Sequence, residues 1–135
     1  MKAIDTNVLV RFLVNDDAKQ AQAVRELFHQ AEKQQGVFFI PLLVVLETLW
    51  VLDSAYGIAR DEIINVFKDL LLLPILEFEN RSAVQNMVSS AHGTNFDLSD
   101  LLIAESARLA GCSNILTFDK KAARNDLFQP VGSGT

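Results

Sequence analysis

Short apolar runs alternate along this chain with longer segments whose apolar residues recur at helical spacing. Four of the runs are typical of buried strands, namely Lys2 to Asp5, Val37 to Ile40, Ile75 to Phe78 and Asn114 to Phe118. A repeated strand–helix order favours a parallel sheet with helices on both faces. Ligands bind such α/β sheets at the carboxyl ends of the strands, where Asp5 and Asp119 fall.

The segments between these runs are predicted to be helices. They span Thr6 to Val14, Asp17 to Gly36, Leu42 to Tyr56, Asp61 to Leu73, Asn80 to the loop at Gly93, and Leu98 to Ala110, with a short helix from Asp119. Helical spacing places four groups of apolar residues on inward faces. The groups are Val24, Leu27, Phe28 and Ala31; Leu43, Leu46, Trp50 and Val51, which share their face with Glu47; Ile63, Ile64, Phe67, Leu70 and Leu71; and Val84, Met87 and Val88.

Size and composition fit one compact domain. The chain has 135 residues, half of them apolar, so we expect a single domain over residues 1–131 and a disordered tail over residues 132–135. Cys112 is the only cysteine, and we expect it to be a small buried residue. A chain without a possible internal disulfide, and without a recognisable signal peptide at its start, suits the cytoplasm. The longest apolar run, Ile40 to Leu52, is too short to span a bilayer.

The formal net charge of −5 argues against non-specific electrostatic binding of nucleic acid. It does not exclude a nuclease, because bound divalent cations would cancel several negative charges locally. Four basic residues also lie near candidate acids in the sequence: Arg11, Lys120, Lys121 and Arg124.

Four acids interrupt or flank apolar segments: Asp5, Glu47, Asp100 and Asp119. An ionised carboxylate in apolar surroundings is expensive to desolvate unless a cation compensates it, and a divalent cation would explain all four acids together. Helix capping is the alternative for most of them. Asp5 and Asp119 each precede a helix, and Asp97 and Asp100 have the spacing of a capping pair. Glu47 lies in the middle of a helix, where capping does not apply.

Other catalytic patterns are missing from the sequence. His29 and His92 have no metal-ligand spacing with Cys112 or with each other, so both are expected at the surface. No serine lies in G-x-S-x-G, and neither a phosphate-binding G-x-x-x-x-G-K-[ST] nor a G-x-G-x-x-G follows a strand. Hydrolase-triad, P-loop and dinucleotide-binding functions are therefore disfavoured.

Four segments resemble the ordered motifs of PIN-domain ribonucleases. They are the opening IDTNVLVRFLVND, the Glu47 helix, the late FDLSDLLIAESARLAG and the closing ILTFDKKAAR. The similarity covers nearly the whole chain, and within the family it is greatest to VapC, the toxin of VapBC toxin–antitoxin pairs. The resemblance implies a PIN-like three-layer sandwich, with a central, mostly parallel sheet flanked by helices. The chain departs from the family at Glu105, where a small residue is common.

The same resemblance implies the site and its chemistry. Asp5, Glu47, Asp100 and Asp119 would hold Mg²⁺ or Mn²⁺, with Asp100 matching the third acid better than Asp97. Small polar residues would add supporting hydrogen bonds, namely Thr6, Asn7 and Thr117. A metal-activated water would then hydrolyse the RNA phosphodiester bond. The implied partners are the RNA substrate and a small VapB-like antitoxin.

Three alternatives remain at this point. A PIN nuclease could act in RNA processing without an antitoxin, and a non-catalytic α/β module could use its acids only as caps. A phosphatase of the aspartyl-phosphate type is disfavoured, since Asn7 stands where the second aspartate would be needed. A homodimer is also expected, because the helices Leu42 to Tyr56 and Asp61 to Leu73 carry more apolar surface than a small domain readily hides. Trp50 and Tyr56 are expected in the core or in this interface.

Overall fold

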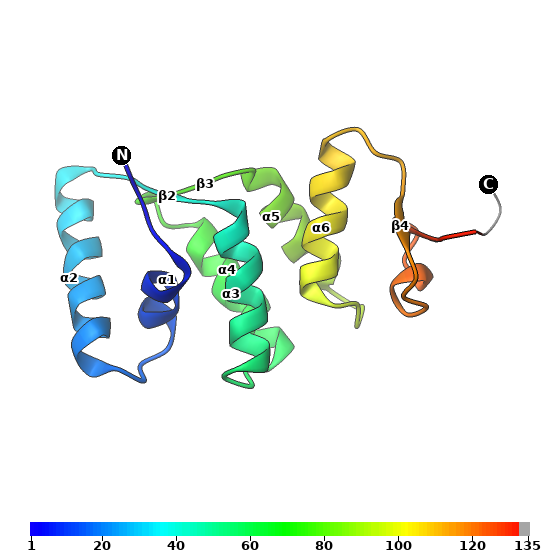
Figure 1. Cartoon of the computed structure of the whole chain (residues 1–135). Coiled ribbons are helices and arrows are strands. Elements are labelled where there is room, and N and C mark those ends of the chain that lie inside the picture. Colours follow the sequence, from blue (N-terminus) through cyan, green and yellow to red (C-terminus); the bar gives the residue numbers. More distant parts are fainter. Residues whose placement is uncertain (133–135) are drawn as a thin grey trace. The chain divides into compact units, whose positions relative to one another are not determined.

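The computed structural model describes residues 1–132 (Figure 1). The order of elements is β1 (Lys2–Ala3), α1 (Thr6–Leu13), α2 (Ala18–Gln34), β2 (Phe38–Ile40), α3 (Leu42–Ser54), α4 (Arg60–Leu71), β3 (Leu76–Phe78), α5 (Arg81–Ala91), α6 (Leu98–Leu109), β4 (Ile115–Thr117), the 3-10 helix η1 (Ala122–Arg124) and β5 (Phe128–Pro130). The chain forms two compact units, Met1–Arg81 and Ser82–Thr135. The α/β class and the alternation of strands and helices are as predicted.

The sheet of the first unit is parallel, in the order β1-β2-β3. Lys2 pairs with Phe38, and Ile40 pairs with Phe78. The ladder continues past the strands, because Glu79 N–H donates to the carbonyl of Ile40 at 2.9 Å. Parallel strands have their carboxyl ends on the same side of the sheet. Asp5, after β1, and Glu79, after β3, therefore both lie on that side.

Two aspartates start the first two helices. The Asp5 Oδ1 atom accepts from the N–H of Val8 at 3.1 Å and caps α1, while Asp17 Oδ1 caps α2 through the N–H of Gln20 at 3.0 Å. Each bond satisfies a donor that has no partner inside the helix. Helix α2 ends at Gln34, just before Gly36, and its C-cap Gln35 has the left-handed conformation with φ 55°.

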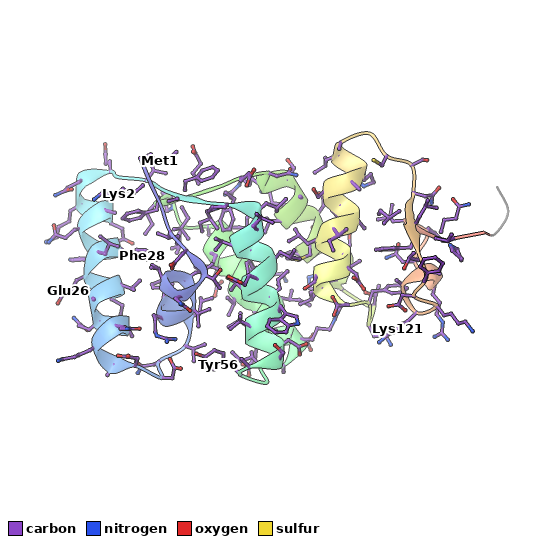
Figure 2. The ribbon with its side chains drawn as sticks, in the orientation of Figure 1. Met1, Lys2, Glu26, Phe28, Tyr56 and Lys121 are labelled. Atoms are coloured by element: carbon purple, nitrogen blue, oxygen red, sulfur yellow. The ribbon has the colours of Figure 1, made fainter. Side chains whose placement is uncertain are left out.

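The core of the first unit follows the predicted helix faces where those faces are clearly amphipathic. All five inward residues predicted for α4 are buried. Phe28 projects from α2 (Figure 2) and its ring lies 4.7 Å from that of Phe12 and 5.6 Å from that of Phe38. Leu27 was predicted to be buried, yet 45% of its surface is exposed.

The predicted inward face of α3 is wrong. Its Leu43 and Trp50 are 76% and 64% exposed, so Trp50 is not a core residue. The helix instead buries a different set, Val45, Thr48, Leu49 and Leu52. The reason is that α3 is apolar on almost every side, and apolar residues all around a helix give no periodicity from which to choose a face.

The second unit contains α5, α6 and the parallel pair β4-β5, in which Ile115 pairs with Phe128. Strand β5 was not predicted. A small apolar cluster joins α6 to this pair and is formed by Ala104, Ala122 and Phe128, with Ile115 and Leu127 against it. Glu105 on α6 is buried but compensated, because it accepts from Arg108 at 2.6 Å and from the hydroxyl of Ser90 at 3.2 Å.

Several smaller predictions can be compared with the structure. Cys112 is exposed, not buried, because it follows the turn at Gly111 that ends α6. The helix expected from Asp119 is the single 3-10 turn η1. The expected tail falls on residues 133–135, outside the described residues, apart from Gly132. One domain over residues 1–131 stays a prediction. None of the helices within residues 1–132 is both long and apolar enough to cross a membrane.

Candidate functional site

Two of the predicted acids line one hollow of the first unit. Asp5 lies between β1 and α1, Glu47 lies on α3, and the hollow of about 350 Å³ has as its lining Asp5, Thr6, Asn7, Val44, Glu47 and Val51. Helices α1 and α3 contact each other directly. One Asp5 oxygen, Oδ1, is engaged in capping α1, which leaves Oδ2 available to a ligand. Capping and ligand binding are therefore compatible at this residue.

The predicted surroundings of the acids are wrong in one respect. Asp5, Glu47 and Asp119 are exposed, and Asp100 is half-buried, whereas the sequence argument placed all four in apolar surroundings. Glu47 is exposed because it shares the outward face of α3 with Leu43 and Trp50. Asp5 follows an apolar strand, but it stands at a helix start, where backbone N–H groups and water solvate it.

In the second unit, the two neighbouring aspartates of α6 have different roles. Asp97 is the N-cap, and its Oδ1 accepts from the N–H of Asp100 at 3.1 Å. The Asp100 carboxylate lies in the first turn. Burial is the largest cause that raises the pKa of Asp100, followed by the negative charges of Asp97 and then Asp119. Asp100 and Asp119 therefore lie near enough for their charges to interact.

Asp119 is held in a tight turn after β4. Its Oδ1 accepts from the N–H of Lys121 at 2.8 Å and of Ala122 at 3.3 Å. The hydroxyl of Thr117 accepts from the N–H of Asp119 at 2.9 Å. Thr117 thus helps to fix the turn, and Asp119 keeps Oδ2 for other contacts.

The predicted site residues belong to both units. The first unit holds Asp5, Glu47, Thr6 and Asn7, and the second holds Asp100, Asp119 and Thr117. Within residues 1–132 the structure places no group of three or more His, Cys, Asp or Glu side chains as a metal site. The donors are carboxylate and hydroxyl oxygens in both units, with the amide oxygen of Asn7 in the first, and these suit the hard cations Mg²⁺ and Mn²⁺.

The basic residues and histidines singled out in the sequence differ in their surroundings. Lys120, Lys121 and Arg124 are exposed and adjoin Asp119 in the chain. His29 and His92 are exposed, as predicted. Arg11 points instead into a side-chain network with Asp16, Gln20 and Tyr56.

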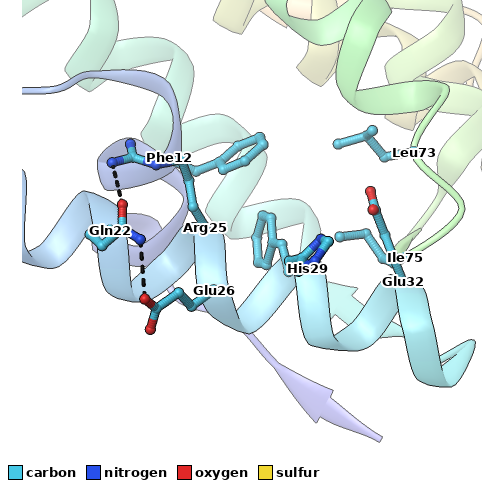
Figure 3. Close-up of a pocket in the computed structure, with 9 residues that line it drawn as sticks. Phe12, Gln22, Arg25, Glu26, His29, Glu32, Leu73 and Ile75 are labelled. Atoms are coloured by element: carbon cyan, nitrogen blue, oxygen red, sulfur yellow. Dashed lines mark hydrogen bonds between the residues drawn. The ribbon is translucent and has the colours of Figure 1, made fainter.

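A larger hollow of about 460 Å³ lies beside α2 and contains none of the predicted site acids (Figure 3). Phe12, Phe28, Leu73 and Ile75 line it, together with the polar side chains of Gln22, Arg25, Glu26, His29 and Glu32. Three of these polar groups are paired with one another: Arg25 donates to Gln22 at 3.0 Å, and Gln22 donates to Glu26 at 3.1 Å. Volume alone therefore does not identify the candidate site.

Two polar contacts at the ends of α3 were missed by the sequence reasoning. Glu79 accepts a hydrogen bond from the N–H of Leu42, at the start of α3. Tyr56, just past the end of α3, donates to Asp16. Glu79 could have been suspected, because it directly follows a predicted strand, as Asp5 and Asp119 do. Nothing in the local sequence pairs Tyr56 with a residue 40 positions away.

Comparison with known proteins decides the family. Residues 2–127 match the PIN domain family. The chain belongs to this family. This PIN domain is also 22% identical over 121 residues to a protein named VapC ribonuclease from Aquifex aeolicus (strain VF5), a match that covers 90% of this chain and 89% of that protein. The resemblance seen in the motifs is thereby confirmed.

We predict that Asp100→Asn raises the melting temperature of the metal-free protein near neutral pH. The pKa of Asp100 is raised in the folded chain, so stability from this group is complete below its unfolded pKa of about 4 and is lost as pH rises through the higher folded pKa. An asparagine cannot ionise and avoids that loss. The gain should shrink as pH falls toward about 4. Thermal melts in EDTA across this range measure it.

The matched control is Asp97→Asn. Asparagine caps helices about as well as aspartate, and the variant relieves only one of the charges near Asp100, so its melting temperature should change less. A variant Asp100→Asn that melts lower than wild type at neutral pH would contradict the prediction.

Proposed function

We propose that this PIN domain is a metal-dependent endoribonuclease and the toxin of a type II toxin–antitoxin pair. The observation that carries the proposal is the hollow that Asp5 and Glu47 share with Thr6 and Asn7. The family supports it, and so does the similarity to a protein named VapC ribonuclease. Asp5 follows β1, and the carboxyl ends of parallel strands are where α/β proteins bind ligands.

In this proposal the metal ligands are Asp5, Glu47, Asp100 and Asp119. A bound Mg²⁺ or Mn²⁺ would supply activation of the attacking water and stabilisation of the leaving oxygen. Asp5 and Asp119 each keep one carboxylate oxygen free while the other accepts backbone N–H groups. These bonds hold each carboxylate in one orientation before a metal binds. The side chain then loses little conformational freedom on metal binding.

The choice of Asp100 over Asp97 has a physical basis. Asp97 is exposed, whereas Asp100 is half-buried and carries a raised pKa because burial and neighbouring charge disfavour its ionised form. A cation would remove that unfavourable interaction, so metal binding and the stability of this region are coupled.

The substrate in this proposal is RNA, and the place of action is the cytoplasm. Lys120, Lys121 and Arg124 are exposed next to Asp119 and can approach phosphate groups. A chain with net charge −5 repels a polyanion as a whole, so affinity for RNA should depend on the cation as well as on these side chains.

We predict that Asp5→Asn abolishes cleavage of RNA and leaves the fold intact. The substitution removes a charged ligand oxygen, while asparagine still caps α1. Incubation of the purified, partner-free protein with total RNA and Mn²⁺, followed by mapping of the cut ends, measures the effect. The control is Asp17→Asn, which makes the same chemical change at the cap of α2, outside the site. Undiminished cleavage by Asp5→Asn, or by wild type in excess EDTA, would exclude the mechanism.

The partner in this proposal is a small antitoxin that lays an apolar or helical segment over the acidic hollow. An arginine of the partner could reach the exposed carboxylates of Asp5 and Glu47, because charge-assisted bonds from a guanidinium suit such a pair. The inhibitor would then compete directly with cation and RNA.

We predict that expression of the wild-type chain alone arrests growth and that co-expression of a short neighbouring gene restores it. Asp5→Asn should be harmless when expressed to the same level, which separates toxicity by cleavage from toxicity by overexpression. Growth unaffected by active wild-type protein would favour a PIN nuclease that acts without an antitoxin.

We also propose a homodimer that associates through α3. The predicted apolar residues of α4 are buried, so they are not available to a second copy. On α3, by contrast, Leu43 and Trp50 are exposed, on a different face of the helix from its buried residues. Exposed aromatic and aliphatic side chains of this kind are typical of interface centres.

We predict that Trp50→Glu shifts the dimer toward monomer at micromolar concentration, because the charge would be buried without a partner in the interface. Light scattering over a concentration series measures it. Leu72→Glu is the control, since Leu72 is 77% exposed outside α3. A wild type that is monomeric at all concentrations would remove the dimer proposal.

A further inference from the structure

Helix α3, which carries Glu47, is held at its start by a side chain from another element. Pro41 precedes the helix and cannot cap it through its own side chain. The N–H of Leu42 donates instead to Glu79 Oε1 at 2.8 Å. Glu79 also donates its own N–H to the carbonyl of Ile40 at 2.9 Å. One residue therefore extends the β2–β3 ladder and places a negative charge at the positive end of α3.

The far end of α3 is held by a ring of three side chains. The hydroxyl of Tyr56 (Figure 2) donates to Asp16 Oδ2 at 2.7 Å and accepts from Arg11 Nη1 at 3.2 Å. The same Arg11 nitrogen lies 3.3 Å from Asp16 Oδ1. The guanidinium of Arg11 is charged at any physiological pH, and the hydrogen bond to Tyr56 is the largest cause that raises its pKa further. Arg11 stands in the last turn of α1.

These contacts affect the candidate site because α1 and α3 are the helices whose residues line the hollow in the first unit. Asp5 starts α1 and Glu47 lies on α3, and the hollow is lined by the start of α1 and by residues along α3 from Val44 to Val51. A slip of α3 by one residue along its axis is about 1.5 Å. Metal–ligand distances tolerate only about 0.2 Å. Small movements of α3 against α1 are therefore enough to separate the two carboxylates for metal binding.

We propose that Glu79 and Tyr56 are positioning residues, which hold α3 at both ends so that the Glu47 carboxylate keeps the spacing to Asp5 that a divalent cation requires. The inference rests on the proposed function. Both residues act through Glu47.

The test is a titration of the metal-free full chain with Mn²⁺ by calorimetry, together with RNA cleavage at several Mn²⁺ concentrations. Tyr56→Phe removes only a hydroxyl, and Glu79→Ala removes the acceptor at the start of α3. Loss of a group that orients a metal ligand weakens metal binding by roughly tenfold or more, so we expect the Mn²⁺ dissociation constant to rise by that factor in each variant. Cleavage should fall at limiting Mn²⁺ and recover at saturating Mn²⁺, with KM for RNA unchanged.

Matched variants separate positioning from a general loss of structure. Ser54→Ala removes a hydrogen bond of the same kind, from Ser54 to the carbonyl of Trp50 at 2.7 Å, within α3 and without a link to α1. It should bind Mn²⁺ like wild type. Glu79→Gln keeps an acceptor for Leu42 and should largely restore the affinity that Glu79→Ala loses. If Glu79→Gln loses as much as Glu79→Ala, Glu79 is itself a ligand and the positioning role is overturned.

The outcomes distinguish this inference from the proposed function. If wild type binds Mn²⁺ and cleaves RNA while Tyr56→Phe and Glu79→Ala titrate like Ser54→Ala, the positioning role is overturned and the nuclease stands. A wild type that binds no Mn²⁺ overturns both. Melting curves in EDTA show that each variant is folded at the titration temperature.

Discussion

Parallel pairing of β1, β2 and β3 is the constraint on which the first unit depends. Because the strands run in the same direction, the chain leaves all of them at one edge, and the residues that follow the strands must start helices or turns there. Asp5 caps α1 and Glu79 caps α3 for that reason. The helix starts, with their unpaired N–H groups, thus attract carboxylates to the edge where an α/β protein binds ligands. At Asp5, the helix cap and the proposed metal ligand are therefore the same residue.

Helix faces could be predicted from the sequence only where polar residues define the opposite face. In α4, charged and apolar residues alternate at helical spacing, and every predicted inward residue is buried. In α3, the apolar residues surround the helix, so the buried side depends on which neighbours are present. Strand β5 was missed because Phe128 to Pro130 is short and ends in a proline, which rarely lies inside a sheet.

The places of the acids after strands or on helices could be predicted, but not how exposed they are. Desolvation cost suggested burial, whereas Asp5 and Asp119 are exposed and accept from backbone N–H groups at the start of a helix or turn. That mechanism depends on local spacing, and the sequence did raise it as the capping alternative. The ties that Glu79 and Tyr56 make are different, because they join residues 37 and 40 positions apart. Such pairs arise from the packing of elements and leave no trace in a local pattern.

The exposed Cys112 has a practical consequence when it is considered together with Trp50. The chain has one cysteine and one tryptophan; the thiol lies in the second unit and the indole in the first, and both are exposed. A thiol-reactive dye attached to Cys112 would therefore accept fluorescence energy from a single known donor. Energy transfer from Trp50 to the dye would report on the distance between the two units. Changes in that distance on addition of Mn²⁺, RNA or a partner protein could be followed in solution without introducing a new residue.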